Sequence, residues 1–105
     1  MSSSRPMRMR AAVQDGVTEV RVLMSHPMET GHRRDASGAP IPAHFITDFT
    51  ATHKGRIVLS AQLGPAISAD PYLAFRFKGG ASGDTVVLSW IDNRGEQQRD
   101  EVQIR

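Results

Sequence analysis

The sequence predicts an all-β fold, a β-sandwich or small barrel of about seven short strands. Apolar and polar residues alternate with a period of two along most of the chain, as half-buried strands require. Turn sequences such as Asp15-Gly16 and Asp92-Asn93-Arg94-Gly95 separate the alternating segments. No segment carries the apolar stripe of an amphipathic helix.

The length and composition are those of one compact domain. A chain of 105 residues supplies one hydrophobic core but not two. Its hydrophobic content of 39% and charged content of 23% are ordinary for a globular protein and argue against global disorder. We therefore expect a flexible N-terminus over residues 1–6 and a single domain over residues 7–105.

The N-terminal part of the domain predicts a hairpin. Residues 7–14 and 18–24 alternate on either side of the Asp15-Gly16 turn, and the second strand ends before Pro27, which cannot donate to a strand ladder. The side chains expected to share the inward face are Met7, Met9, Ala11, Val13, Thr18, Val20, Val22 and Met24.

The rest of the chain predicts five further strands. Residues 45–52 and 57–63 form a second hairpin, and residues 73–78 and 86–91 alternate in the same way. Residues 96–105 are polar apart from two positions, which suits an edge strand protected by charge. Across the core we expect Trp90 to face Leu73, Phe75 and Phe77.

Residues 25–43 form the one long irregular stretch. It contains several Pro and Gly residues and has no periodicity. Loops of this length inside compact domains are uncommon and are often functional or disordered. Because Met28 and Ile41 offer apolar anchors, an ordered projecting loop or β-ribbon is the favoured interpretation.

Charge indicates neither nucleic-acid nor membrane binding. The net charge is only +2, from 13 Lys and Arg against 11 Asp and Glu, and the signs alternate along most of the chain. Arg5, Arg8 and Arg10 are the exception, and we interpret them as part of a solvated terminus. No apolar segment follows them, so no secretory signal is expected.

The sequence predicts no catalytic residue, no cofactor and no metal. There is no Cys, so this chain has no thiol for nucleophilic or metal chemistry. The histidines lie far apart in sequence, and a site joining His26 and His44 across the long loop has no support from spacing. Ser25 and His26 are neighbours that would point to opposite faces of a strand. Asp92 is interpreted as a turn residue.

Four segments resemble the SoxZ family. They are residues 16–31, 41–46, 64–79 and 83–95, and the likeness extends over nearly the whole chain from Met7 onward. The most specific part is Ser-His-Pro-Met-Glu-Thr-Gly at 25–31.

The resemblance implies an immunoglobulin-like sandwich with no catalysis of its own. It also implies a heterodimer with SoxY, whose C-terminal cysteine arm carries sulfur intermediates of thiosulfate oxidation, and transient docking to other Sox enzymes. SoxZ-like proteins work in the periplasm and are exported with their partner. The alternatives are a generic immunoglobulin-like accessory module and, less favoured, a metal enzyme that uses the histidines.

The most distinctive segment is the predicted docking site for the partner or the enzymes. Its alternative is a loop that folds onto its own domain. Two arginines beyond it are candidates for attracting an anionic adduct or an acidic patch, although a solvated loop tip is the favoured interpretation for both. The predicted docking residues are Ser25, His26, Pro27, Met28, Glu29, Thr30, Gly31, Arg33 and Arg34.

Overall fold

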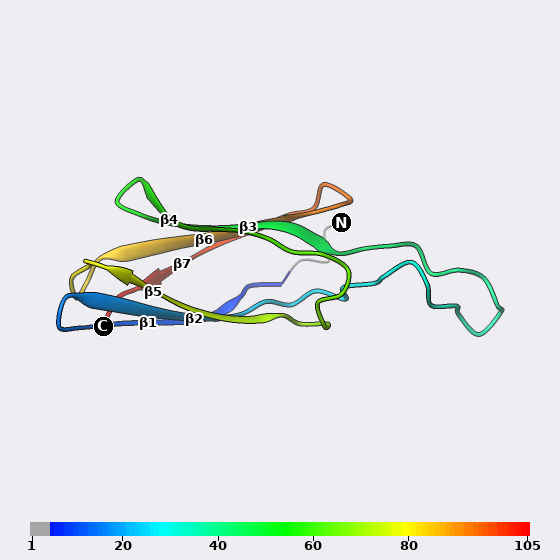
Figure 1. Cartoon of the computed structure of the whole chain (residues 1–105), viewed down its shortest axis with the longest axis horizontal. Coiled ribbons are helices and arrows are strands. Elements are labelled where there is room, and N and C mark those ends of the chain that lie inside the picture. The colour runs from blue at the N-terminus through cyan, green and yellow to red at the C-terminus, as the bar shows by residue number, and fades with distance from the viewer. Residues whose placement is uncertain (1–4) are drawn as a thin grey trace.

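The computed structural model describes residues 5–105 and contains seven strands. Figure 1 shows two layers of strands and a long ribbon that projects from one end. The described residues include no helix long and apolar enough to cross a membrane. The strands are β1 (Arg8–Gln14), β2 (Val17–Leu23), β3 (Ile46–His53), β4 (Arg56–Gln62), β5 (Tyr72–Lys78), β6 (Thr85–Asp92) and β7 (Gln97–Gln103).

The strands form two antiparallel sheets that pack face to face. One sheet has the order β1-β2-β5 and the other the order β4-β3-β6-β7. The sheets meet along one side, where Ala11 pairs with Ile104 and the amide of Arg105 donates to Ala11. This is a β-sandwich, one of the two forms that the strand pattern predicted, and it confirms the immunoglobulin-like sandwich that the resemblance implied.

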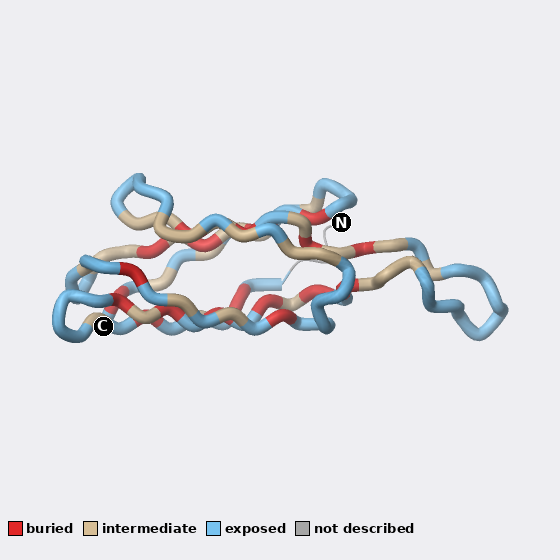
Figure 2. Tube along the Cα trace, viewed as in Figure 1, coloured by how far each residue is buried: buried red, intermediate tan, exposed pale blue. Residues whose placement is uncertain are grey.

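The core lies between the sheets, where the period-two pattern placed it. All the second-strand positions predicted to face inward, from Thr18 to Met24, are buried. Phe49, Ile46 and Leu88 fill the middle of the layer and are fully buried. Figure 2 shows buried residues along the facing sides of both layers, whereas the turns and the ribbon tip are exposed.

Trp90 has a different neighbour from the one expected. Its ring meets the imidazole of His26 edge-on, with centroids 5.1 Å apart. Phe75 instead contacts Phe49, and Phe77 contacts His53. The expected Trp90 pairing with the phenylalanines is therefore wrong at the level of ring contacts, because the root of the ribbon inserts a histidine beside the indole.

The irregular stretch is a β-ribbon, one of the two favoured interpretations. Glu29 and His44 form an antiparallel bridge, and so do Arg34 and Pro40. The amide of Ile41 donates to the carbonyl of Arg33 (2.8 Å) between these bridges. We call residues 29–44 the ribbon. The expected flexible N-terminus, residues 1–6, lies for the most part outside the described residues and stays a prediction.

Gly80 provides a test of the close approach between the β5–β6 turn and β2. Its φ is +89°, and a Cβ there would collide with Thr18 Oγ1 and lie 3.1 Å from Ile104 Cδ1. We expect Gly80→Ala to lower the free energy of unfolding by about 2–4 kcal/mol, since strain and overpacking add. Gly38→Ala is the matched control, because Gly38 has a similar φ of +86° with nothing within 4 Å. Equal losses for the two variants in urea denaturation would show that the contact contributes nothing.

Candidate functional site

The site lies where the ribbon joins the sandwich. His26 follows β2, and its amide donates to Asp70 Oδ1 (3.0 Å) while its carbonyl accepts from the Asp70 amide (2.8 Å). His44 precedes β3 and forms the last ribbon bridge with Glu29. These backbone bonds fix the two histidines on opposite strands of the ribbon root, with ring centroids 4.5 Å apart.

Asp92 joins the two histidines from the end of β6. Its Oδ2 lies 2.9 Å from His26 Nε2 and 2.7 Å from His44 Nε2. Its Oδ1 accepts the backbone N–H groups of Arg94 (3.0 Å) and Glu96 (2.9 Å) in the β6–β7 turn. The Asp92 side chain is fully buried. We call His26, His44 and Asp92 the clamp, because they connect both strands of the ribbon to this turn.

The clamp holds Asp92 as a carboxylate. Burial by itself raises the pKa of Asp92, because it disfavours the charged form. The hydrogen bonds from His26 and His44, together with those from the Glu96 and Arg94 amides, outweigh burial and leave the pKa below its ordinary value. The buried carboxylate accepts four hydrogen bonds, and it therefore holds the ribbon root and the β6–β7 turn together.

A second connection reinforces the ribbon root. The side-chain oxygen of Asn93 accepts from the Phe45 amide (2.8 Å), and its Nδ2 donates to the Ala43 carbonyl (3.0 Å). The Asn93 amide in turn donates to the Phe45 carbonyl (3.0 Å). The turn that follows β6 therefore grips the backbone on both sides of His44.

The clamp has the atoms of a metal site but not the proton arrangement. One ligand atom from each clamp residue lies within 4.8 Å of the others, and two imidazoles with a carboxylate suit zinc or iron(II). However, the Met28 amide donates to His26 Nδ1 (3.1 Å), so the proton of the neutral imidazole is on Nε2. A metal bound at Nε2 would require the proton of the neutral ring to sit on Nδ1. Nδ1 could then no longer accept the hydrogen bond from the Met28 amide. The geometry therefore favours a hydrogen-bonded clamp, and the expected absence of a metal stays a prediction.

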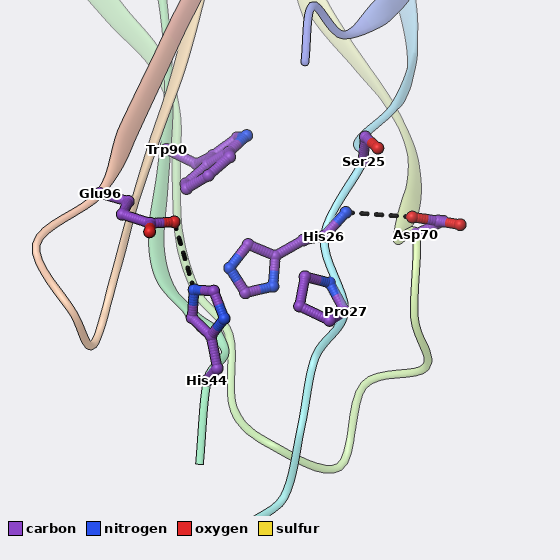
Figure 3. Close-up of a pocket in the computed structure, with 7 residues that line it drawn as sticks. All are labelled: Ser25, His26, Pro27, His44, Asp70, Trp90 and Glu96. Carbon is purple, nitrogen blue, oxygen red and sulfur yellow. Dashed lines mark hydrogen bonds and ion pairs between the residues drawn. The ribbon is translucent and has the colours of Figure 1, made fainter. Parts of the chain in front are cut away.

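A small pocket opens beside the clamp. It has a volume of about 260 Å³, and Figure 3 shows the His26 and His44 rings lying next to one another among the residues that line it. Glu96 Oε2 lies 3.3 Å from His44 Nε2 at the rim. Trp90 also lines the pocket, and its indole Nε1 is buried with no hydrogen-bond partner among residues 5–105. A hydrogen-bond acceptor placed beside this N–H would offset a desolvation cost of about 1–3 kcal/mol.

The structure corrects the expected role of Met28. Its side chain is only 5% exposed and belongs to the hydrophobic core. The Met28 sulfur accepts from the Ile46 amide at 3.4 Å. Because the side chain fills its own domain, it is not a surface anchor for a partner. His26 is likewise buried, so these two residues act inside the domain and the alternative of a loop folded onto its own domain holds for them.

The remaining docking candidates are more accessible. Pro27 is exposed, whereas Ser25, Glu29, Thr30 and Gly31 are half-buried. Docking through these residues stays a prediction, because no partner chain is present to test it.

The two candidate arginines are exposed but already engaged within the ribbon. Arg33 binds Glu29 with two hydrogen bonds of 2.9 and 2.6 Å. Arg34 donates to the Gly38 carbonyl (2.8 Å). Arg33 therefore offers little uncompensated charge to an anionic adduct, and Arg34 offers more.

Sequence reasoning missed two members of the clamp. The sequence spacing gives no support to a site joining His26 to His44, and the local sequence predicts only a turn at Asp92. His44 and His26 are respectively 48 and 66 positions from Asp92 in the sequence. One signal was available: the bases of a ribbon must meet, so histidines just before and just after residues 27–43 would be brought together.

The fold and the site together define a small immunoglobulin-like sandwich with a clamped, projecting ribbon. The same fold occurs in superoxide reductase (neelaredoxin) from Archaeoglobus fulgidus, at a TM-score of 0.62 and 17% identity over 95% of this chain and 87% of that chain. The enzyme of the same name from Ignicoccus hospitalis gives a TM-score of 0.56 and 18% identity over 97% and 82%. At such low identity the likeness concerns the fold alone.

The family is established by the sequence itself. The profile described as "Sulphur oxidation protein SoxZ" matches residues 7–103, nearly the whole chain. No curated protein sequence matches the chain. The chain belongs to the SoxZ family, which gives it a role in sulfur oxidation and implies a partner within the Sox pathway.

Proposed function

We propose that the chain is the non-catalytic subunit of a carrier complex in thiosulfate or sulfur oxidation. It pairs with a SoxY-type subunit, whose C-terminal cysteine arm carries covalent sulfur intermediates between Sox enzymes. The observation that supports this most strongly is the SoxZ family match over residues 7–103.

The chemistry of the chain agrees with this division of labour. Covalent carriage of sulfur needs a thiolate, and the chain contains no Cys. The attachment point must therefore belong to another chain. A carrier arm that visits several enzymes has to be mobile, and it needs a stable base to which it is attached. A sandwich with a filled core is suited to be that base.

The buried polar groups at the ribbon root are the second line of support. The clamp and the Asn93 contacts give the ribbon one direction relative to the sandwich. A fixed projection is suited to contacting another protein in one orientation. The proposal includes a periplasmic location, reached together with the partner subunit.

The test is a pull-down from a periplasmic fraction. The tagged chain, produced with its native neighbours, is expected to recover a second protein in a stable stoichiometric complex. That protein is expected to end in a Gly-rich segment with one cysteine, and incubation of the intact complex with thiosulfate and the pathway enzymes should add sulfur mass to it. Intact-mass analysis identifies both the partner and the adduct.

Two results would contradict the proposal. Recovery of a partner that lacks a terminal cysteine would favour the generic accessory module. Mass addition on this chain, with none on the partner, would overturn its non-catalytic role. As a control, the same extract with an untagged chain should yield neither protein.

A further inference from the structure

The outer face of the β1-β2-β5 sheet carries an unbalanced positive charge. Strand register places Arg8 beside Leu23 and Tyr72, and Arg10 beside Arg21 and Ala74. The next row holds Ala12, Glu19 and Arg76, in which Glu19 is the acid that both Arg21 and Arg76 contact. We call Arg8, Arg10, Arg21, Leu23 and Tyr72 the arginine face.

Two of these arginines lack any acidic partner. Within residues 5–105, neither Arg8 nor Arg10 makes an ion pair. Arg10 lies directly opposite Arg21 in the ladder, and both are exposed. Like charges in this position destabilise a sheet. The isolated domain therefore holds an unfavourable arrangement that an acidic partner would offset.

Apolar side chains lie beside the unpaired charge. Leu23 and Tyr72 are cross-strand neighbours, with 38% and 60% of their surfaces exposed. They line a shallow recess of about 320 Å³ together with Arg8, Arg10 and Arg21. Tyr and Arg are enriched among the residues that dominate protein interfaces. An aromatic side chain and several arginines around one recess are suited to binding another protein.

The opposite face of the sandwich shows a different pattern. There the outward positions of β3, β6 and β7 include Thr50, Ser89 and the paired Arg99 and Glu101. Arg56, at the start of β4, also makes no ion pair within residues 5–105, but it is the one such arginine in the strands of that sheet. Two unpaired arginines on the same face of one strand, Arg8 and Arg10, occur in the β1-β2-β5 sheet.

We propose that the arginine face is a docking surface for an acidic patch on the enzymes that visit the carrier complex. This inference depends on the proposed function. A patch so rich in exposed charge suits a transient, electrostatically steered contact, since permanent subunit interfaces are more apolar. The exposed side chains of Leu23 and Tyr72 beside the arginines favour a protein partner, because a protein patch offers apolar side chains as well as carboxylates, whereas nucleic-acid or lipid phosphates offer charge alone.

The test compares Arg10→Glu with Arg99→Glu in the intact carrier complex. The complex is the variable substrate in thiosulfate-dependent electron transfer with the other pathway enzymes. Arg10→Glu is expected to raise the apparent KM about tenfold at low salt, with kcat unchanged and a weaker salt dependence. Because it converts a repulsive pair with Arg21 into an attractive one, it should leave the unfolding temperature of the domain equal or higher. The control Arg99→Glu should match the wild type in KM.

The outcomes separate this inference from the function on which it depends. An unchanged KM and salt dependence for folded Arg10→Glu would overturn the docking surface. Weaker affinity for the SoxY-type subunit, measured by titration, would make this face the permanent interface and also overturn it. Arginine-dependent binding of the wild-type complex to DNA or to anionic phospholipid vesicles would do the same. A wild-type complex that carries no sulfur would refute the proposed function itself.

Discussion

Asp92→Asn is expected to lower the free energy of unfolding by about 2–4 kcal/mol. Asp92 accepts N–H groups on both oxygens, two from imidazoles and two from the backbone. An amide in either orientation places its NH₂ against a pair of these donors. Urea denaturation followed by circular dichroism measures the loss. Asp48→Asn is the control, because Asp48 lies exposed on β3 and should change stability by less than about 0.5 kcal/mol.

The same substitution changes the pH dependence of stability. Because the folded-state pKa of Asp92 is depressed, its contribution is present above the unfolded-state value of about 3.9 and is lost as pH falls through the folded-state pKa. As the pH is lowered from about 5 through the folded-state pKa of Asp92, the wild type should therefore lose more stability than Asp92→Asn. Parallel curves for the two proteins over this range would show that the Asp92 charge does not stabilise the fold.

Met28→Ala is expected to cost about 2–5 kcal/mol of stability, the scale for truncating a buried methionine. Met28 has a φ of +50°, unusual for a residue with a side chain, so the packing of the thioether has to offset backbone strain. Ile57→Ala is the matched control, because Ile57 is 66% exposed. Thermal and urea unfolding measure both variants.

Partner binding by Met28→Ala distinguishes the two roles considered for this residue. In conditions where the variant is folded, its affinity for the SoxY-type subunit should remain near the wild-type value. A variant with wild-type stability and weakened binding would contradict the buried position. It would instead restore the original prediction that Met28 is a surface anchor.

The strands were predictable from the sequence because their signal is local. Val20 and Val22 lie on one face and Glu19 and Arg21 on the other, and such alternation indicates directly which face is buried. The polar edge strand was predictable for the same reason. Its pattern at residues 96–105 matches β7, which lies at the edge of its sheet.

The complete clamp was not predictable, because the ribbon could bring the two histidines together but nothing local encodes their contact with Asp92. His44 lies at the base of the ribbon and Asp92 lies where β6 meets the following turn, and their side chains are 2.7 Å apart. Each of these elements is encoded by its own local sequence, and none of those sequences specifies the contact between them. Asp92 begins a turn sequence, and turn chemistry alone accounts for an aspartate there. For Met28 the sequence predicted a surface anchor, whereas the side chain is buried. An apolar residue between Pro27 and Glu29 is equally compatible with an exposed anchor and with a core residue. Only the tertiary structure decides between them.

The ribbon behaves mechanically as a cantilever with its fixed end at the clamp. Its outer bridge joins Arg34 to Pro40, and residues 32–40 are all exposed. A force on the exposed tip is resisted by the contacts of His26, His44 and Asn93 at the other end of the ribbon. We therefore expect substitutions at the ribbon tip to leave the sandwich intact. Substitutions at the ribbon root should instead change the orientation of the ribbon relative to the sandwich. The sequence of the ribbon tip and the stability of the domain can in this way change independently of one another.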